Sequence, residues 1–111
     1  MPPLDDVLNK VRDGSVGAAK VEFQDLLNEA KGASEQFISD NATKVETWIT
    51  MLSNGEIDKE EFDDLIADQR LAAEQFANTQ RIEEQQRLAK LTLRILQLAA
   101  TTIAPALLAA L

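Results

Sequence analysis

Residues 54–62 read NGEIDKEEF, and this stretch decides the fold because it holds the signals that end one helix and begin another. Gly55 can supply the left-handed residue that terminates a helix. The carboxylate of Asp58 can accept a hydrogen bond from the amide of Glu61, whose side chain can reach back to the Asp58 amide, which is a capping box. The apolar residues flanking this cap have the spacing of a hydrophobic staple. The predicted turn and its caps comprise Asn54, Gly55, Ile57, Asp58, Glu61 and Phe62.

The same stretch is similar to the second half of a calcium-binding EF-hand loop. Such a loop carries oxygen ligands at positions 1, 3, 5, 7, 9 and 12 and a glycine at position 6. With Gly55 at position 6, Asp58 and Glu61 fall at positions 9 and 12, but positions 1 and 3 are Thr50 and Leu52. The entry carboxylate is therefore missing. We predict a helix–turn–helix and no calcium site.

Composition favours an all-α fold in the 111 residues. The chain has four glycines and three prolines, good helix formers dominate it, and no run alternates with the period of a strand. It has no cysteine and no histidine, which removes disulfides, thiolate chemistry and histidine catalysis. One helix face collects Glu60, Asp64 and Asp68, but no second carboxylate cluster supports a di-metal site. We predict no catalytic residues, no metal and no cofactor.

Apolar residues recur at helical spacing on both sides of the turn, which predicts an elongated antiparallel helical hairpin of coiled-coil type. Helix breaks are possible at Gly32 and within SDNATKVE, residues 39–46. No glycine or proline occurs between Gly55 and Pro105, so we expect one very long helix over 59–103, roughly 65 Å in length. The weakly apolar stretch 79–87 would be a solvated stalk or would pair with another copy through its glutamines.

The expected organisation has five segments. They are a short amphipathic N-terminal helix (1–13), a first hairpin arm (16–53), the turn (54–58), a second arm (59–94) and an apolar tail (95–111). Folding about residue 55 would bring Ile38 near Ala72 and Phe23 near Arg87. The acidic N-terminal residues do not resemble a signal peptide.

Charge is unevenly distributed along the chain, whose net charge is −8. All 19 acidic residues precede residue 85, and the remainder carries only basic charges, at Arg87, Lys90 and Arg94. An acidic body disfavours nucleic acid as a partner, because phosphates require a basic surface. These three residues form a basic collar before the tail.

The tail ILQLAATTIAPALLAAL, residues 95–111, contains no charged residue. Bases on its N-terminal side alone favour a membrane, whereas its 17 residues, its alanine content and a kink or stop at Pro105 disfavour one. Burial in a subunit or partner interface is the main alternative to a membrane, and burial in the core of the chain itself is the weakest of the three interpretations. The residues expected to make these contacts are Ile95, Leu96, Leu98, Ile103, Leu107, Leu108 and Leu111.

These features predict a non-enzymatic structural subunit of a virion, secretion apparatus or filament that forms a homo-oligomer through its apolar C-terminal helix. The alternative is a small tail-anchored membrane protein whose acidic hairpin recruits a protein partner. An adaptor that binds a helix is a third, weaker possibility. We expect the chain on the cytoplasmic side of a membrane or within a larger assembly.

Overall fold

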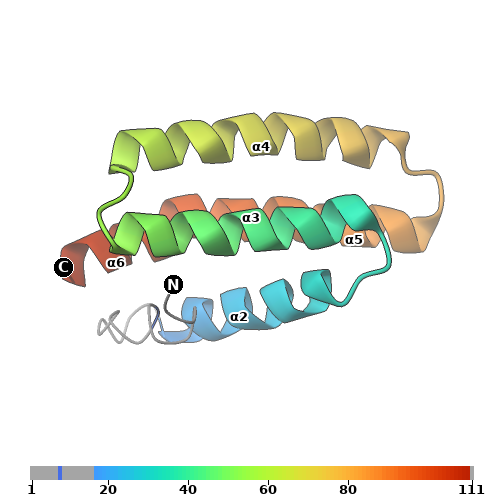
Figure 1. Ribbon diagram of the computed structural model, residues 1–111. Helices are drawn as coiled ribbons and strands as arrows, with labels where there is room; N and C mark the ends of the chain where they lie inside the picture. The colour runs from blue at the N-terminus through green and yellow to red at the C-terminus, as the bar shows by residue number, and fades with distance from the viewer. Residues whose placement is uncertain (1–7, 9–16, 111) are drawn as a thin grey trace.

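The computed structural model describes residues 8 and 17–110, except for the side chain of Ala110 (Figure 1). Within these residues the chain contains only helices and the connections between them. This confirms the all-α prediction. The elements are α2 (Gly17–Lys31), α3 (Gln36–Ser53), α4 (Lys59–Thr79), α5 (Glu83–Leu98), the π-helical turn η2 (Ala99–Ile103) and α6 (Ala104–Ala110). The helix expected at 1–13 lies outside the described residues except for Leu8, which is buried in the core.

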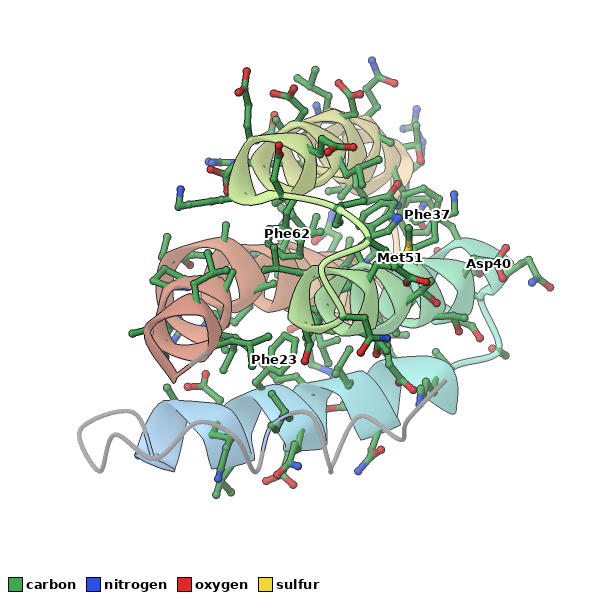
Figure 2. The ribbon with its side chains drawn as sticks, turned by 60° about the vertical axis from the view of Figure 1, so that its left-hand side comes forward. Phe23, Phe37, Asp40, Met51 and Phe62 are labelled. Carbon is green, nitrogen blue, oxygen red and sulfur yellow. The ribbon has the colours of Figure 1, made fainter. Side chains whose placement is uncertain are left out.

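The helices pack as a bundle in which α3 and α5 lie side by side between α4 and α2 (Figures 1 and 2). Helix α2 packs against both α3 and α5, and α4 packs against the same two helices. Helices α2, α3, α4 and α5 run in alternating directions, as their short connections require. The molecule measures 42 × 26 × 24 Å. The extended hairpin is therefore not observed, because both of its arms are bent back on themselves.

The first arm bends at residues 32–35, at the glycine that marked a possible break. Helix α2 ends at Lys31, and the amide of Gly32 donates to the carbonyl oxygen of Asn28 at 3.2 Å. An ion pair between Lys31 and Glu46 then joins α2 to α3. The second possible break, within residues 39–46, does not occur, and α3 runs through it without interruption.

The second arm bends at residues 80–82, so the uninterrupted helix predicted over 59–103 is wrong. Neither glycine nor proline causes this bend. Polar side chains instead replace the missing backbone hydrogen bonds. Thr79 Oγ1 and Gln80 Nε2 donate to the Phe76 carbonyl oxygen at 2.7 and 3.2 Å, and Gln86 Nε2 donates to the Gln80 carbonyl oxygen at 3.0 Å. The bend returns the apolar tail to the bundle.

The stretch 79–87, expected as a stalk or a pairing segment, forms this bend and the first turn of α5. Its glutamines bind groups of the chain itself. Gln86 closes the bend, and Gln85 Nε2 lies 3.5 Å from Glu35 Oε1 at the other bend of the hairpin. The two bends thus lie together at one end of the bundle.

The core joins all the helices. Phe37 of α3 stacks on Phe76 of α4 with ring centroids 4.6 Å apart and an angle of 19° between the ring planes. Stacking of this kind stabilises the pair beyond the contribution of the buried ring area. Figure 2 shows Phe23 and Phe62 pointing into the bundle from opposite sides. The largest fully buried side chains are Phe23, Phe62, Leu8, Leu27, Ile38, Ile49, Ile95, Leu96, Ile103, Leu107 and Val45.

Candidate functional site

The turn between α3 and α4 contains the caps that the sequence predicts. Gly55 has φ +74°, its amide donates to the Leu52 carbonyl oxygen, and the amide of Glu56 donates to the Met51 carbonyl oxygen at 2.9 Å, which is a Schellman motif. The Asp58 carboxylate accepts from the Glu61 amide at 2.8 Å, and a Glu61 carboxylate oxygen lies 3.4 Å from the Asp58 amide. These residues serve local structure.

Ile57 and Phe62, the two positions of the predicted staple, are both buried in the core. The groups expected at a calcium loop are therefore engaged in ending α3 and starting α4. Within residues 8 and 17–110, no group of three or more acidic side chains is arranged to hold a metal ion.

The predicted tail contacts lie inside the bundle. Of the seven residues predicted to make these contacts, Leu98 is 3% exposed and four others are fully enclosed by the chain itself. Leu108 is half-buried, and Leu111 lies outside the described residues. The fully enclosed members are Ile95, Leu96, Ile103 and Leu107. An uncharged apolar segment of this length must be covered by another apolar surface, and α2 and α3 supply that surface here.

A π-helical turn carries the tail past its proline. The amide of Ala104 donates to the carbonyl oxygen of Ala99, five residues earlier, and Pro105 follows at once. A proline has no amide hydrogen and collides with the carbonyl four residues before it, so a wider turn relieves the conflict. Thr101 Oγ1 donates to the Gln97 carbonyl oxygen at 2.7 Å. The helix therefore continues into α6 and does not end at Pro105.

The basic collar binds acidic residues of α2. Arg94 donates two hydrogen bonds to Glu22, from Nε to Oε1 at 3.0 Å and from Nη2 to Oε2 at 3.2 Å. Arg87 Nη1 lies 2.9 Å from Glu29 Oε1. Both pairs are one heptad apart on their helices, so they fix the antiparallel register of α2 and α5. The pairing expected about residue 55 is displaced, because Glu29 and not Phe23 lies opposite Arg87, six residues along α2.

These pairs shift the protonation equilibria of their members. Hydrogen bonding by Arg94 lowers the pKa of Glu22, against a smaller opposing effect of desolvation. Hydrogen bonds to Glu29 and Glu22 raise the pKa values of Arg87 and Arg94, respectively. The groups are exposed, so the pairs specify register more than they add stability.

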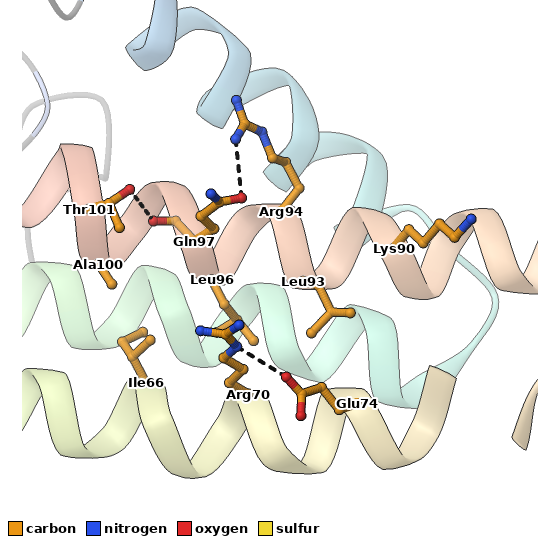
Figure 3. A pocket seen from close by; sticks show the side chains of 10 residues that line it. All are labelled: Ile66, Arg70, Glu74, Lys90, Leu93, Arg94, Leu96, Gln97, Ala100 and Thr101. Carbon is orange, nitrogen blue, oxygen red and sulfur yellow. Dashed lines mark hydrogen bonds and ion pairs between the residues drawn. The ribbon is translucent and has the colours of Figure 1, made fainter. Parts of the chain in front are cut away.

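The outer side of α5 forms an open groove with α4, with a volume of about 540 Å³ (Figure 3). Ile66, Leu93, Leu96 and Ala100 form its apolar floor. Its polar rim consists of Arg70, Glu74, Lys90, Arg94, Gln97 and Thr101. The rim thus carries three bases and one acid on a chain whose net charge is −8.

Most of the rim charges are already satisfied. Arg70 Nε pairs with Glu74 Oε1 at 3.1 Å, and Arg94 is bound to Glu22 and to Gln97 Oε1. Lys90 is exposed and makes no ion pair within the part of the chain that the structure describes. In the predicted collar, both arginines therefore pair with α2, although Arg94 also lines the groove, and Lys90 alone lines the groove without an ion pair among the described residues.

The outer surface of α4 beside this groove combines apolar and acidic groups. Leu71 is 60% exposed and stands three residues before the rim residue Glu74. Glu60, Asp64 and Asp68 are exposed and make no ion pair within the described residues. Like charges at this helical spacing repel one another. Within the described part of the chain, no basic side chain neutralises this stripe of carboxylates.

One buried polar side chain, that of Asn41, was not predicted from the sequence. Asn41 on α3 is 0% exposed, and neither its amide nitrogen nor its amide oxygen has a hydrogen-bond partner among the residues that the structure describes. In the sequence it stands among apolar residues at core spacing, between Ile38 and Val45, and only that pattern could have pointed to it. A buried amide without partners destabilises a fold by about 1–3 kcal/mol.

The segment Glu83–Ala109 is helical over 27 residues; its most apolar 18-residue window has a mean hydropathy of 1.5, and half of that window is buried inside the bundle. By length and composition alone it could cross a membrane, a test that core helices also pass. No protein-family model, curated protein or solved structure matches this chain. Its function is therefore inferred from the geometry.

Proposed function

We propose that this chain is a non-enzymatic structural subunit that self-associates through its C-terminal helix. The observation that carries the proposal is the division of α5 into two faces. Its apolar side is buried by α2, α3 and α4, while outward side chains, among them Lys90, Leu93 and Gln97, line an open groove beside α4. Grooves with an apolar floor and a polar rim have the composition of reversible protein interfaces.

Self-association through the groove side of α5 differs from docking through a free apolar tail. Four aliphatic side chains of the tail are fully enclosed, and each contributes about 1.5–3 kcal/mol by burial. Releasing them to bind another copy would cost on the order of 10 kcal/mol, which is comparable to the whole stability of a domain. Association through the outer face of the helix leaves that core intact.

Sedimentation velocity of the full chain over a range of micromolar concentrations tests the proposal. We expect the weight-average sedimentation coefficient to rise with concentration toward a discrete oligomer. A coefficient that stays at the monomer value over the whole range would refute self-association. Deleting residues 95–111 is unsuitable here, because it removes core side chains and would unfold the bundle.

A membrane role is the second candidate, and it is favoured by the length and hydropathy of Glu83–Ala109. In that case the helix must leave the bundle before it enters a bilayer. Flotation of the full chain with vesicles of neutral and of anionic lipid distinguishes the two functions. Recovery with the vesicles, accompanied by a change in Trp48 fluorescence, would favour the membrane role, and recovery in the bottom fraction is expected for the structural subunit.

A further inference from the structure

The exposed side of α4 and the groove between α4 and α5 face in different directions. Residues of the exposed side follow one another at steps of three and four, which places them on one side of the helix. The α4 residues that line the groove belong to the side turned toward α5. Each copy of the chain therefore offers both surfaces at once. The exposed side, named here the outer ridge of α4, comprises Glu60, Asp64, Ala67, Asp68 and Leu71.

We infer that the groove of one copy holds the outer ridge of α4 of a second copy. The contact is heterologous, because it joins two different surfaces of the chain. Leu71, which is 60% exposed in the monomer, then lies on the apolar floor of the groove, beside Leu93. The inference rests on the self-association proposed above and specifies the two surfaces that meet.

The groove has dimensions that suit a helix. It extends along α5 from Lys90 to Thr101, a rise of about 16 Å, which matches three turns of a second helix. Amphipathic helices commonly bind proteins by laying their apolar side in a groove of this kind. On the outer ridge, three turns reach from Asp64 past Leu71, so the exposed leucine and the acidic side chains before it fit within one groove.

Charge sets the direction in which the second α4 lies. Lys90 marks one end of the groove and makes no ion pair within the described residues, whereas the uncharged Thr101 marks the other end (Figure 3). Every carboxylate of the ridge precedes Leu71, and the exposed residues that follow it on the same side, Gln75 and Asn78, are uncharged. The second α4 therefore runs parallel to α5, with its acidic half beside Lys90.

Asp64 is the ridge carboxylate that is best placed to pair with Lys90. It stands one heptad before Leu71, so it lies within about 20° of that residue around the helix axis and about 10 Å away along it. When Leu71 lies on the apolar floor, Asp64 is thus within reach of the long lysine side chain. Glu74, the one acid of the rim, is already ion-paired along α4 and leaves Lys90 available.

The exposed side of α2 matches the groove less well than the outer ridge of α4 does. Val21 of α2 is 55% exposed, but the nearby Glu22 and Glu29 are already paired with arginines of α5. The ridge carboxylates make no ion pair within residues 8 and 17–110, so they gain a partner by docking. A second copy therefore supplies what the groove requires, which is an aliphatic side chain flanked by unneutralised carboxylates.

The contact is small and leaves binding surfaces free. Three turns of a helix about 10 Å in diameter bury on the order of 300 Å² per copy, well below the ~800 Å² of a standard interface, so association is reversible and depends on concentration. A pair of copies retains one free ridge and one free groove. Further copies can therefore add until the rotation between neighbours closes a ring.

Two variants of the full chain that each disable one surface test the inference by sedimentation velocity. Leu71→Glu disables the ridge, and the double variant Lys90→Glu with Ala100→Phe disables the groove by reversing its unpaired charge and filling part of its floor. Each variant alone should associate at least about tenfold more weakly than wild type. Their equimolar mixture should form a dimer and nothing larger, because one variant retains its groove and the other its ridge.

Controls separate these effects from unfolding. Val21→Glu introduces the same charge at an exposed residue of α2 and should associate as wild type does. Circular dichroism establishes that each variant is folded. If the double variant is not folded, Lys90→Glu alone replaces it, since that side chain is exposed.

Charge reversal tests the direction of docking. Lys90→Glu should weaken association, and adding Asp64→Lys to the same chain should restore it at least in part. Failure of the second substitution to restore any association would overturn the parallel arrangement with α5.

The possible results separate the two proposals. If wild type associates but Leu71→Glu associates equally well, or if the two disabled variants remain monomeric when mixed, these surfaces are wrong while self-association stands. A wild-type chain that is monomeric at every concentration would refute both proposals and leave the groove to a helix of another protein.

Discussion

Replacing Leu107 by alanine tests whether the end of the tail belongs to the core of its own chain. Leu107 is 0% exposed in α6, which packs on α3. The substitution removes three buried carbon atoms, and at ~0.8 kcal/mol for each the transfer contribution is about 2.4 kcal/mol. A residual cavity adds to this, so we expect a loss of about 3 kcal/mol in the free energy of unfolding, within the range for buried leucines.

Urea unfolding followed by Trp48 fluorescence measures this loss. With a denaturant dependence of about 1.5 kcal/mol per molar urea, the midpoint should fall by about 2 M. Leu108→Ala is the matched control, because it truncates the same side chain at the adjacent, half-buried position. Its midpoint should fall by less than half as much. Equal midpoints for the two variants would refute the burial of the tail within the monomer.

Three further substitutions test single interactions. Asn41→Leu should raise the free energy of unfolding by about 1–3 kcal/mol, because it removes a buried amide without partners; an unchanged urea midpoint would contradict this. The pKa of Glu22 is lowered from its ordinary value of 4.5 by Arg94, so the stabilisation from this pair is present above pH 4.5 and is lost as the pH falls through the lowered pKa. The melting temperature of wild type should therefore exceed that of Glu22→Gln at neutral pH, and the difference should shrink below pH 4.5; a constant difference would argue against the pair. Asp58→Ala should cost about 1 kcal/mol through loss of the N-cap, whereas Asp58→Asn, which still accepts from Glu61, should cost much less in the same thermal scans.

Local features were predictable from the sequence because their causes are local. The Schellman motif at Gly55 and the capping box at Asp58 each involve residues within five positions of one another. The break at Gly32 was marked by the same residue type. The bend at residues 80–82 had no such mark, since its hydrogen bonds come from glutamine and threonine side chains that suit a continuous helix equally well.

The candidate site was predictable only in part. The sequence placed Arg87, Lys90 and Arg94 on one helix, but it could not show that the arginines bind Glu29 and Glu22 while the lysine faces a groove. That division depends on which helices flank α5. The unpartnered amide of Asn41 was hidden for a related reason, because burial and hydrogen bonding are properties of neighbours that lie far away in the sequence.

The amino-acid sequence by itself determined the all-helical class, the turn at 54–58 and the apolar side of each helix. Tertiary structure alone decided what covers the tail. Apolar burial is non-directional and depends on area removed from water, so the uncharged run at 95–111 suits a bilayer, a partner or its own bundle equally well. Two bends in the hairpin resolved this ambiguity, by bringing α2 and α3 against Ile95, Ile103 and Leu107.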